Sequence, residues 1–283
     1  MRRIKLTLSY DGTAYHGFQR QGRGLICVQD ALFVAIAAVT GETPRGFAAA
    51  GRTDAGVHAM GQVVAFDTSG SIPTERIAQA LNSHLPPDVS ALQAVEVDAS
   101  FHPRFDAVAK EYVYTIHGFN GNNRHAMAGR WSLHLAGRLD LAAMDLAARS
   151  LIGTYDCSAF QDVGRPVRDA TRTIMSCRVD SIQYREAPWT GIPVAQVFVR
   201  ADGFLLHMVR VIAGTLVAVG RGRFAPDSLA AIVAAKDRRG AGPTLPPQGL
   251  CLMRVLYPDR QAEVDAACER RSPTLVDTPG TVS

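Results

Sequence analysis

The stretch from Ala50 to Gln62, AGRTDAGVHAMGQ, combines residue types that suit a catalytic loop. Its single carboxylate is Asp54, Arg52 lies two residues before it, and three glycines surround the pair: Gly51, Gly56 and Gly61. A carboxylate can act as a nucleophile or as a general base. An aspartate before Ala-Gly is also typical of a tight turn, in which its side chain accepts hydrogen bonds from nearby backbone amides. The stretch by itself leaves both interpretations open.

The composition is that of an ordinary soluble globular protein. The chain has 283 residues, of which 47% are hydrophobic and 20% charged, which is enough for one large domain or two medium ones. No apolar run approaches the roughly 20 residues that a membrane span requires. The N-terminus enters a strand-like pattern without the features of a signal peptide. We therefore expect a cytoplasmic protein that does not cross a membrane.

The basic residues are almost all arginine. Lysine appears three times among 30 basic residues, which leaves 27 arginines and a net charge of +4. Arginine suits planar phosphate contacts and stacking on bases, although GC-rich codons raise the arginine content of every protein in a genome. The net charge and the arginine content are therefore compatible with a nucleic-acid partner but do not by themselves indicate one.

Cysteine and histidine show no metal-binding or disulfide pattern. The five cysteines are scattered without a CxxC pair, and the histidines lack spacings such as HExxH. We therefore expect neither a disulfide framework nor a zinc site.

Hydrophobic periodicity places the Asp54 stretch between two strands, within an element order that occurs twice. The expected strands are 4–10, 46–50, 62–67, 89–97, 111–117, 170–185, 193–200 and 249–257. The expected helices are 28–40, 74–84, 139–152, 205–220 and 226–235. This order predicts an α+β fold with two βαββαβ-type halves. Their antiparallel-rich sheets would join into one mixed central sheet, with helices on one face and a cleft between the halves.

The expected division assigns residues 1–105 to an N-terminal half that carries the Asp54 loop. Residues 106–259 form a C-terminal half that completes the site. The stretch 260–283 has no sustained period and is rich in Thr, Pro, Ser and charge. We expect it to be a disordered tail.

Seven stretches, in order along the chain, resemble the tRNA pseudouridine synthases of the TruA type. GRTDAGVHA is the most specific of them, and together they extend from about Lys5 to Asp259. The other six are YDGTAYHGFQRQ (10–21), VQDAL (28–32), LNSHLPPDV (81–89), FHPRFDAVAKEYVY (101–114), HMVRVIAGTLVAVGRG (207–222) and GPTLPPQGLCL (242–252).

The resemblance implies an isomerase that converts uridine to pseudouridine at positions 38 to 40 of the anticodon stem-loop of tRNA. The N1–C1′ glycosidic bond breaks, the uracil turns, and the base rejoins the ribose through C5. This reaction involves no redox change, so neither a cofactor nor a metal is expected. The resemblance also implies a homodimer whose two subunits grip one tRNA.

Three residues match the family's active site. Asp54 matches the essential aspartate, which either attacks carbon or removes a ribose proton. Arg210 matches the arginine expected to pair with it, and its apolar neighbours favour such a pairing, since a charge in so apolar a segment usually needs a partner. Tyr112 matches the tyrosine expected to stack on the flipped uracil. Strand alternation places Tyr114 on the same face, so only the match distinguishes the two.

Other residues are expected to contact RNA. Arg52 in the family handles the RNA backbone or helps to move the target base, and glycines around it permit positive φ and close approach to the ribose. Arg165, Arg168 and Arg172 form one candidate backbone patch, and Arg20 and Arg23 form another. His58 and His207 are interpreted as structural or RNA-contact residues.

Two other functions are compatible with parts of the pattern. One is an RNA-binding or RNA-folding protein that has kept the fold without catalysis, which the intact Asp54, Tyr112 and Arg210 argue against. The other is a glycoside-cleaving hydrolase, which usually needs two carboxylates. The Asp54 loop contains no second acid, although a distant one could fold in.

Overall fold

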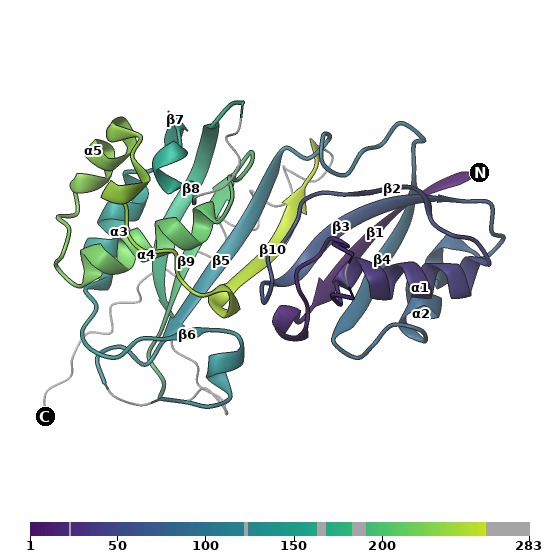
Figure 1. The fold of residues 1–283 in the computed structure, drawn as a ribbon, viewed down its shortest axis with the longest axis horizontal. Coiled ribbons are helices and arrows are strands. Elements are labelled where there is room, and N and C mark those ends of the chain that lie inside the picture. Colours follow the sequence, from purple (N-terminus) through teal and green to yellow (C-terminus); the bar gives the residue numbers. More distant parts are fainter. Residues whose placement is uncertain (23, 122–123, 163–167, 183–190, 259–283) are drawn as a thin grey trace, which may run out of the picture.

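The structure is a computed structural model that describes residues 1–258 except 23, 122–123, 163–167 and 183–190. Its strands form a ten-stranded mixed sheet, with helices packed beside both ends (Figure 1). The expected tail, 260–283, lies outside the described residues. Within the described part of the chain, no helix is both long and apolar enough to cross a membrane.

The first part of the chain has the predicted order of strands and helices. Its elements are β1 (Arg2–Tyr10), α1 (Val28–Thr40), β2 (Arg45–Ala49), β3 (His58–Thr68), α2 (Thr74–Asn82) and β4 (Val89–Val97). α1 ends as expected at Gly41, whose φ of 73° suits glycine. β3 begins at His58, before the predicted start at Gln62, because its first residues pair with a strand from the end of the chain.

The second part repeats this order with two short additional strands. Its elements are β5 (Ala109–His117), β6 (Leu133–His134), α3 (Leu141–Arg149), β7 (Gly153–Asp156), β8 (Thr171–Ile182), β9 (Val194–Ala201), α4 (Met208–Gly220), α5 (Ser228–Ala235) and β10 (Leu250–Leu256). β6 and β7 were not predicted, since two and four residues are too few to show alternation. α4 starts later than the predicted residue 205 because His207 has left-handed backbone angles.

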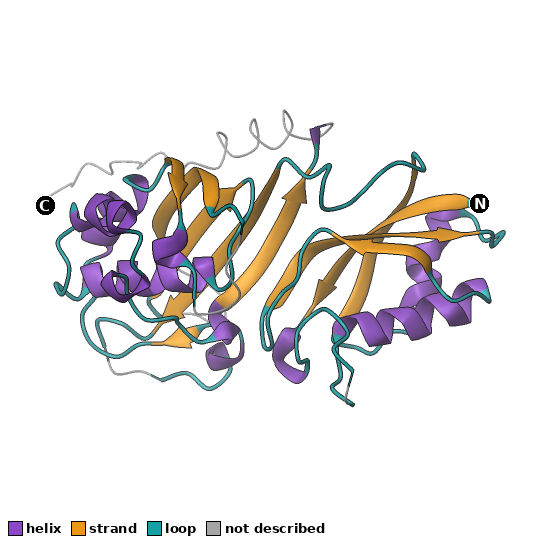
Figure 2. Cartoon of the chain, turned by 45° about the horizontal axis from the view of Figure 1, so that its top comes forward, coloured by secondary structure: helices purple, strands orange, loops and turns teal. Residues whose placement is uncertain are grey.

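One parallel contact joins the two halves of the sheet. The strand order is β4-β1-β3-β10-β5-β9-β8-β7, with β2 on β3 and β6 on β5. β10 runs parallel to β3, pairing Cys251 with His58 and Leu252 with Ala59. A side chain at Gly61 would come within 2.5 Å of the Met253 carbonyl oxygen, so the close approach of these strands needs glycine. Figure 2 shows the resulting sheet, and the predicted α+β class is confirmed.

A single row of paired residues crosses the sheet on its helix-covered face. The row runs Tyr10, Ala59, Leu252, Tyr112, Val199 and Cys177, each paired with the next across neighbouring strands. All six belong to the main hydrophobic core. Both halves therefore pack the same face of the sheet against their helices. Tyr112 lies on β5, the strand next to β10, close to where β3 and β10 join the two halves.

Candidate active site

The Asp54 loop connects β2 to β3 and is held by the loop that follows β1. The Tyr10 hydroxyl lies 2.8 Å from Thr53 Oγ1, and the Phe18 N–H donates to the Thr53 carbonyl at 3.1 Å. A side chain at Gly12 would come within 2.0 Å of the Val57 carbonyl oxygen. The YDGTAYHG and GRTDAG motifs, far apart in the sequence, therefore form one packed unit whose shape presents Asp54.

The loop forms a turn, but the Asp54 carboxylate makes none of the hydrogen bonds that close it. The Val57 N–H donates to the Asp54 carbonyl at 3.1 Å, which closes the turn through the backbone. Within the described ranges, no backbone amide donates to the carboxylate, contrary to the simple turn interpretation. Of the three glycines in the stretch, only Gly56 has a positive φ, at 76°. The expectation that all three serve the loop was wrong, because Gly61 lies at the β3–β10 joint.

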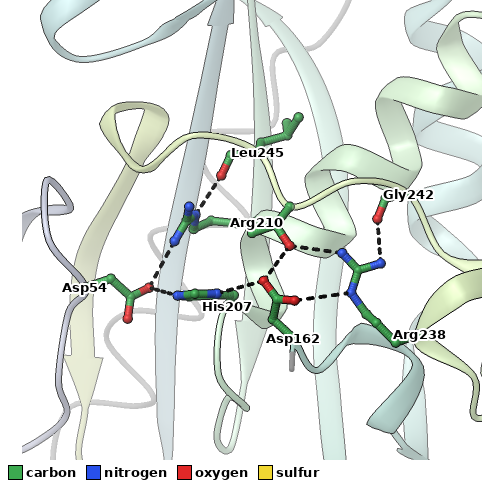
Figure 3. A network of polar contacts seen from close by, with 8 residues as sticks. Asp54, Asp162, His207, Arg210, Arg238, Gly242 and Leu245 are labelled. Atoms are coloured by element: carbon green, nitrogen blue, oxygen red, sulfur yellow. Dashed lines mark hydrogen bonds and ion pairs between the residues drawn. The ribbon is translucent and has the colours of Figure 1, made fainter. Parts of the chain in front are cut away.

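Arg210 lies against Asp54, as the sequence predicted. Its Nη1 is 3.4 Å from Asp54 Oδ2, and the two side chains are 12% and 33% exposed. The Arg210 Nε–H also donates to the Leu245 carbonyl at 2.6 Å, which fixes the guanidinium from its other side (Figure 3). The catalytic role of the pair stays a prediction.

His207 also contacts Asp54, which sequence reasoning did not predict. Its Nε2 lies 3.4 Å from Asp54 Oδ2, and its Nδ1 lies 3.0 Å from Asp162 Oδ2. His207 precedes Arg210 by three residues at the start of α4, a spacing that places both side chains on one side of a helix. The sequence contained that signal for His207. It contained none for Asp162, which follows the 3-10 helix Ser158–Phe160.

Tyr112 and Tyr114 share a face but differ in surroundings. Tyr112 is 7% exposed, and its ring packs edge-on against Phe204 with centroids 5.0 Å apart. Burial raises the pKa of the Tyr112 hydroxyl, and the nearby Tyr10 and Asp54 raise it further. The Tyr114 hydroxyl instead donates to the Pro246 carbonyl at 2.7 Å. Tyr114 is therefore used in packing, whereas the Tyr112 hydroxyl makes no hydrogen bond within the described part of the chain.

Lys110 is a second residue that sequence reasoning missed. It precedes Tyr112 by two positions in β5, so strand alternation places both on the face that carries the site. A side chain at Gly51 would lie 3.5 Å from Lys110 Nζ. Burial, together with the charges of Arg104 and Arg172, lowers the pKa of Lys110 to about 8. No described residue forms a hydrogen bond or an ion pair with it.

The remaining predicted RNA contacts lie on the surface or outside the described residues. Arg52 and Arg168 are exposed, and neither contacts Asp54. Arg20 forms an ion pair with Asp30 at 2.5 Å. Arg172 packs beside Gly203. Arg23 and Arg165 lie outside the described residues.

His58 has buried, structural surroundings. Its Nδ1 lies 3.2 Å from Asp11 Oδ1, and burial lowers its pKa.

Within the described ranges, no group of three or more His, Cys, Asp or Glu side chains is arranged to hold a metal ion.

The sequence is similar to those of known proteins. A sequence model of a family described as tRNA pseudouridine synthase matches residues 7–106 and 147–258. The tRNA pseudouridine synthase A of Moorella thermoacetica is 46% identical over 257 residues, covering 90% of this chain and 99% of the relative. That of Syntrophomonas wolfei is 44% identical over 259 residues, covering 92% and 99%, and that of Geobacter sulfurreducens is 44% identical over 257 residues, covering 91% and 100%.

The chain therefore belongs to the tRNA pseudouridine synthase family, a family of isomerases. The resemblance found in the sequence motifs is confirmed.

Proposed function

We propose that this protein converts uridine to pseudouridine at positions 38 to 40 of tRNA, with Asp54 as the reacting carboxylate. The observation that carries the proposal is the unequal use of the two carboxylate oxygens. Arg210 and His207 both contact Oδ2, whereas Oδ1 accepts no hydrogen bond from any described residue. With its side chain 33% exposed, Asp54 can be anchored through one oxygen while the other meets the ribose or the base.

Tyr112 and the arginines complete the proposed site. A uridine within a stem must leave the base stack, at a cost of a few kcal/mol. Stacking on the Tyr112 ring and phosphate contacts from Arg52 and Arg168 offset that cost. The N1–C1′ bond then breaks, and C5 of the rotated uracil bonds to C1′. C5 loses its proton, and N1 takes up a proton from solvent, so that the product is an isomer of the substrate. Every atom of the substrate except that exchanged proton stays in the product.

The proposal includes a cytoplasmic homodimer in which residues 1–105 and 106–259 act as the two halves of one catalytic unit. Its support is the resemblance to the family, together with the Asp54–Arg210 contact, which joins the two halves. Light scattering coupled to size-exclusion chromatography tests the dimer directly. A monomer at the concentrations used for activity measurements would remove this part of the proposal.

The decisive experiment incubates the protein with unmodified tRNA transcripts and maps pseudouridine along the anticodon arm. We expect product at positions 38 to 40 with the wild type and none with Asp54→Asn, which keeps the shape of the side chain but removes its charge. The variant should still bind tRNA. Release of free uracil would indicate the hydrolase alternative, and binding without product would indicate a non-catalytic RNA-binding protein.

A further inference from the structure

The second contact on Asp54 comes from a residue with unusual backbone geometry. His207 caps the N-terminus of α4 with φ 58° and ψ 8°, in the left-handed region. Residues other than glycine adopt this conformation uncommonly, although histidine does so more often than most. The consequence is that the imidazole, 26% exposed, lies between two carboxylates: Asp54 from one half of the protein and Asp162 from the other.

Asp162 is itself held in place. Thr244 Oγ1 donates to Asp162 Oδ2 at 2.8 Å, and Arg238 Nε lies 4.0 Å from its Oδ1. The Arg238 guanidinium donates to Thr244 Oγ1 at 2.9 Å, and the Asp162 backbone N–H donates to the Leu206 carbonyl at 3.1 Å. Figure 3 shows the resulting chain of contacts from Arg238 through Asp162 and His207 to Asp54. The far end of the chain is thus fixed independently of Asp54.

Two supports therefore converge on one oxygen. Leu245 holds Arg210, which contacts Asp54 Oδ2, while Thr244 holds Asp162 and, through it, His207 on the same Oδ2. Each support restrains the carboxylate from a different direction. Together they fix the torsion angle of the carboxylate and so determine where Oδ1 points.

We propose that His207, oriented by Asp162, is a positioning residue that holds Asp54 Oδ2 and thereby aims Oδ1 at the substrate. The inference rests on the proposed role of Asp54. It goes beyond the Asp54–Arg210 pair, because it assigns the second restraint to an imidazole and the control of that imidazole to a carboxylate on another loop. The two ring nitrogens face the two carboxylates, Nε2 toward Asp54 and Nδ1 toward Asp162.

The test uses three replacements of His207. His207→Gly removes the ring and suits the positive φ. We expect it to keep the melting temperature at or above that of the wild type. Its single-turnover rate at saturating tRNA should fall about 100-fold, the scale of effect expected from a misplacement of about 1 Å. The tRNA dissociation constant should stay within twofold.

The other two replacements distinguish the role of Nε2 of His207 from that of Nδ1. The amide nitrogen of His207→Gln reaches roughly as far as Nε2, toward Asp54, whereas that of His207→Asn reaches only as far as Nδ1, toward Asp162. We expect Gln to recover part of the lost rate and Asn to recover none. Equal rates for the two variants, or better recovery with Asn, would contradict the positioning role.

Asp162→Asn tests the second step of the inference. Because Asp162 is expected to act only through His207, the substitution should slow the wild type but have no further effect in the His207→Gly background. Additive losses would show that Asp162 acts by another route and would overturn that step.

A parallel Asp54→Asn measurement distinguishes this inference from the proposed function. An active Asp54→Asn enzyme would refute the function assigned to Asp54. An inactive one beside a His207→Gly enzyme with a normal single-turnover rate would refute only the role of His207. A His207→Gly variant that merely binds tRNA more weakly would make His207 an RNA contact instead.

Discussion

The two oxygens of Asp54 are in different chemical surroundings, although a sequence records only one carboxylate. Arg210 and His207 both lie 3.4 Å from Oδ2, while Oδ1 accepts no hydrogen bond from any described residue. These contacts at one oxygen restrain the orientation of the carboxylate. The reactivity of the site therefore depends as much on these neighbours as on the aspartate itself.

Replacing Arg210 should affect turnover more than binding. Arg210→Ala removes the buried partner charge of Asp54, so we expect the single-turnover rate to fall about 100-fold or more. Affinity for tRNA should change much less. Arg210→Lys should restore only part of the rate, because a lysine cannot contact both Asp54 and the Leu245 carbonyl with a planar fork. A normal single-turnover rate combined with weak binding would contradict the assigned role.

Lys110 should give the folded protein a measurable pH dependence. Its pKa in the folded state, about 8, lies below its ordinary value of 10.5. Between these two values the unfolded chain binds more protons than the folded chain, so the contribution of Lys110 to stability rises with pH. The free energy of unfolding can be measured by urea denaturation from pH 7 to 10.5. We expect the difference between the wild type and Lys110→Met to shift in favour of the wild type above pH 8, and a difference that is constant with pH would contradict this.

At the scale of elements, the segment from Gly242 to Gly249 holds the side chains around Asp54 in place. It packs so tightly on α4 that a side chain at Gly214 would lie 1.9 Å from the Pro243 carbonyl oxygen. The Gly242 N–H donates to Thr215 Oγ1 at 2.9 Å. The same segment provides the contacts to Arg210 and Asp162. The GPTLPPQGLCL motif therefore supports two side chains of the candidate site that lie outside the motif, Arg210 and Asp162.

Gly214→Ala should destabilise the protein even though alanine favours helices. The usual gain of roughly 0.5–1 kcal/mol for alanine over glycine in a helix should be outweighed by overpacking that costs about 1–3 kcal/mol. The displaced segment should also lower the rate of turnover. Gly240→Ala is the matched control, because a side chain there meets no atom within 4 Å. Thermal melts and single-turnover rates check both variants, and a Gly214→Ala enzyme as stable and active as the control would contradict the packing argument.

At the scale of the whole molecule, the site exists only because the two halves are joined in one register. The pairing of β3 with β10 carries the core row of residues across the joint. Asp11 adds a second connection, accepting hydrogen bonds from Arg130 Nε at 2.7 Å and Trp131 Nε1 at 3.1 Å. Asp54 then meets Arg210 across the same boundary. The arginines proposed to contact the tRNA backbone, Arg52 and Arg168, lie exposed on the surface and do not contact Asp54.

Arg168 tests the proposed grip on the RNA backbone. An arginine on a phosphate contributes a salt-dependent term to binding, so Arg168→Ala should weaken tRNA binding and reduce the slope of log affinity against log salt by about 1. Turnover at saturating tRNA should change little. Arg76 on α2, also exposed, provides the control substitution Arg76→Ala. Equal salt slopes for the two variants would remove Arg168 from the interface.

The sequence by itself determined the family and the fold class, and it predicted Asp54 as the reacting carboxylate. The order of strands and helices followed from hydrophobic periodicity, because side chains in helices and strands repeat at different intervals. The loop with Asp54 followed from residue types and motif, and Arg210 from a charge within an apolar helix. These properties are local, so a single stretch of chain carries each of them.

Only the tertiary structure decided what surrounds the carboxylate. Asp162 has no local signature, and it contacts His207 only because the loop after Phe160 folds against the start of α4. The difference between Tyr112 and Tyr114 is that the Tyr114 hydroxyl donates a hydrogen bond to the Pro246 carbonyl. The position of β10 between β3 and β5 depends on a glycine that lets two strands approach. Each of these contacts joins residues distant in sequence, and a periodic pattern carries no information about such partners.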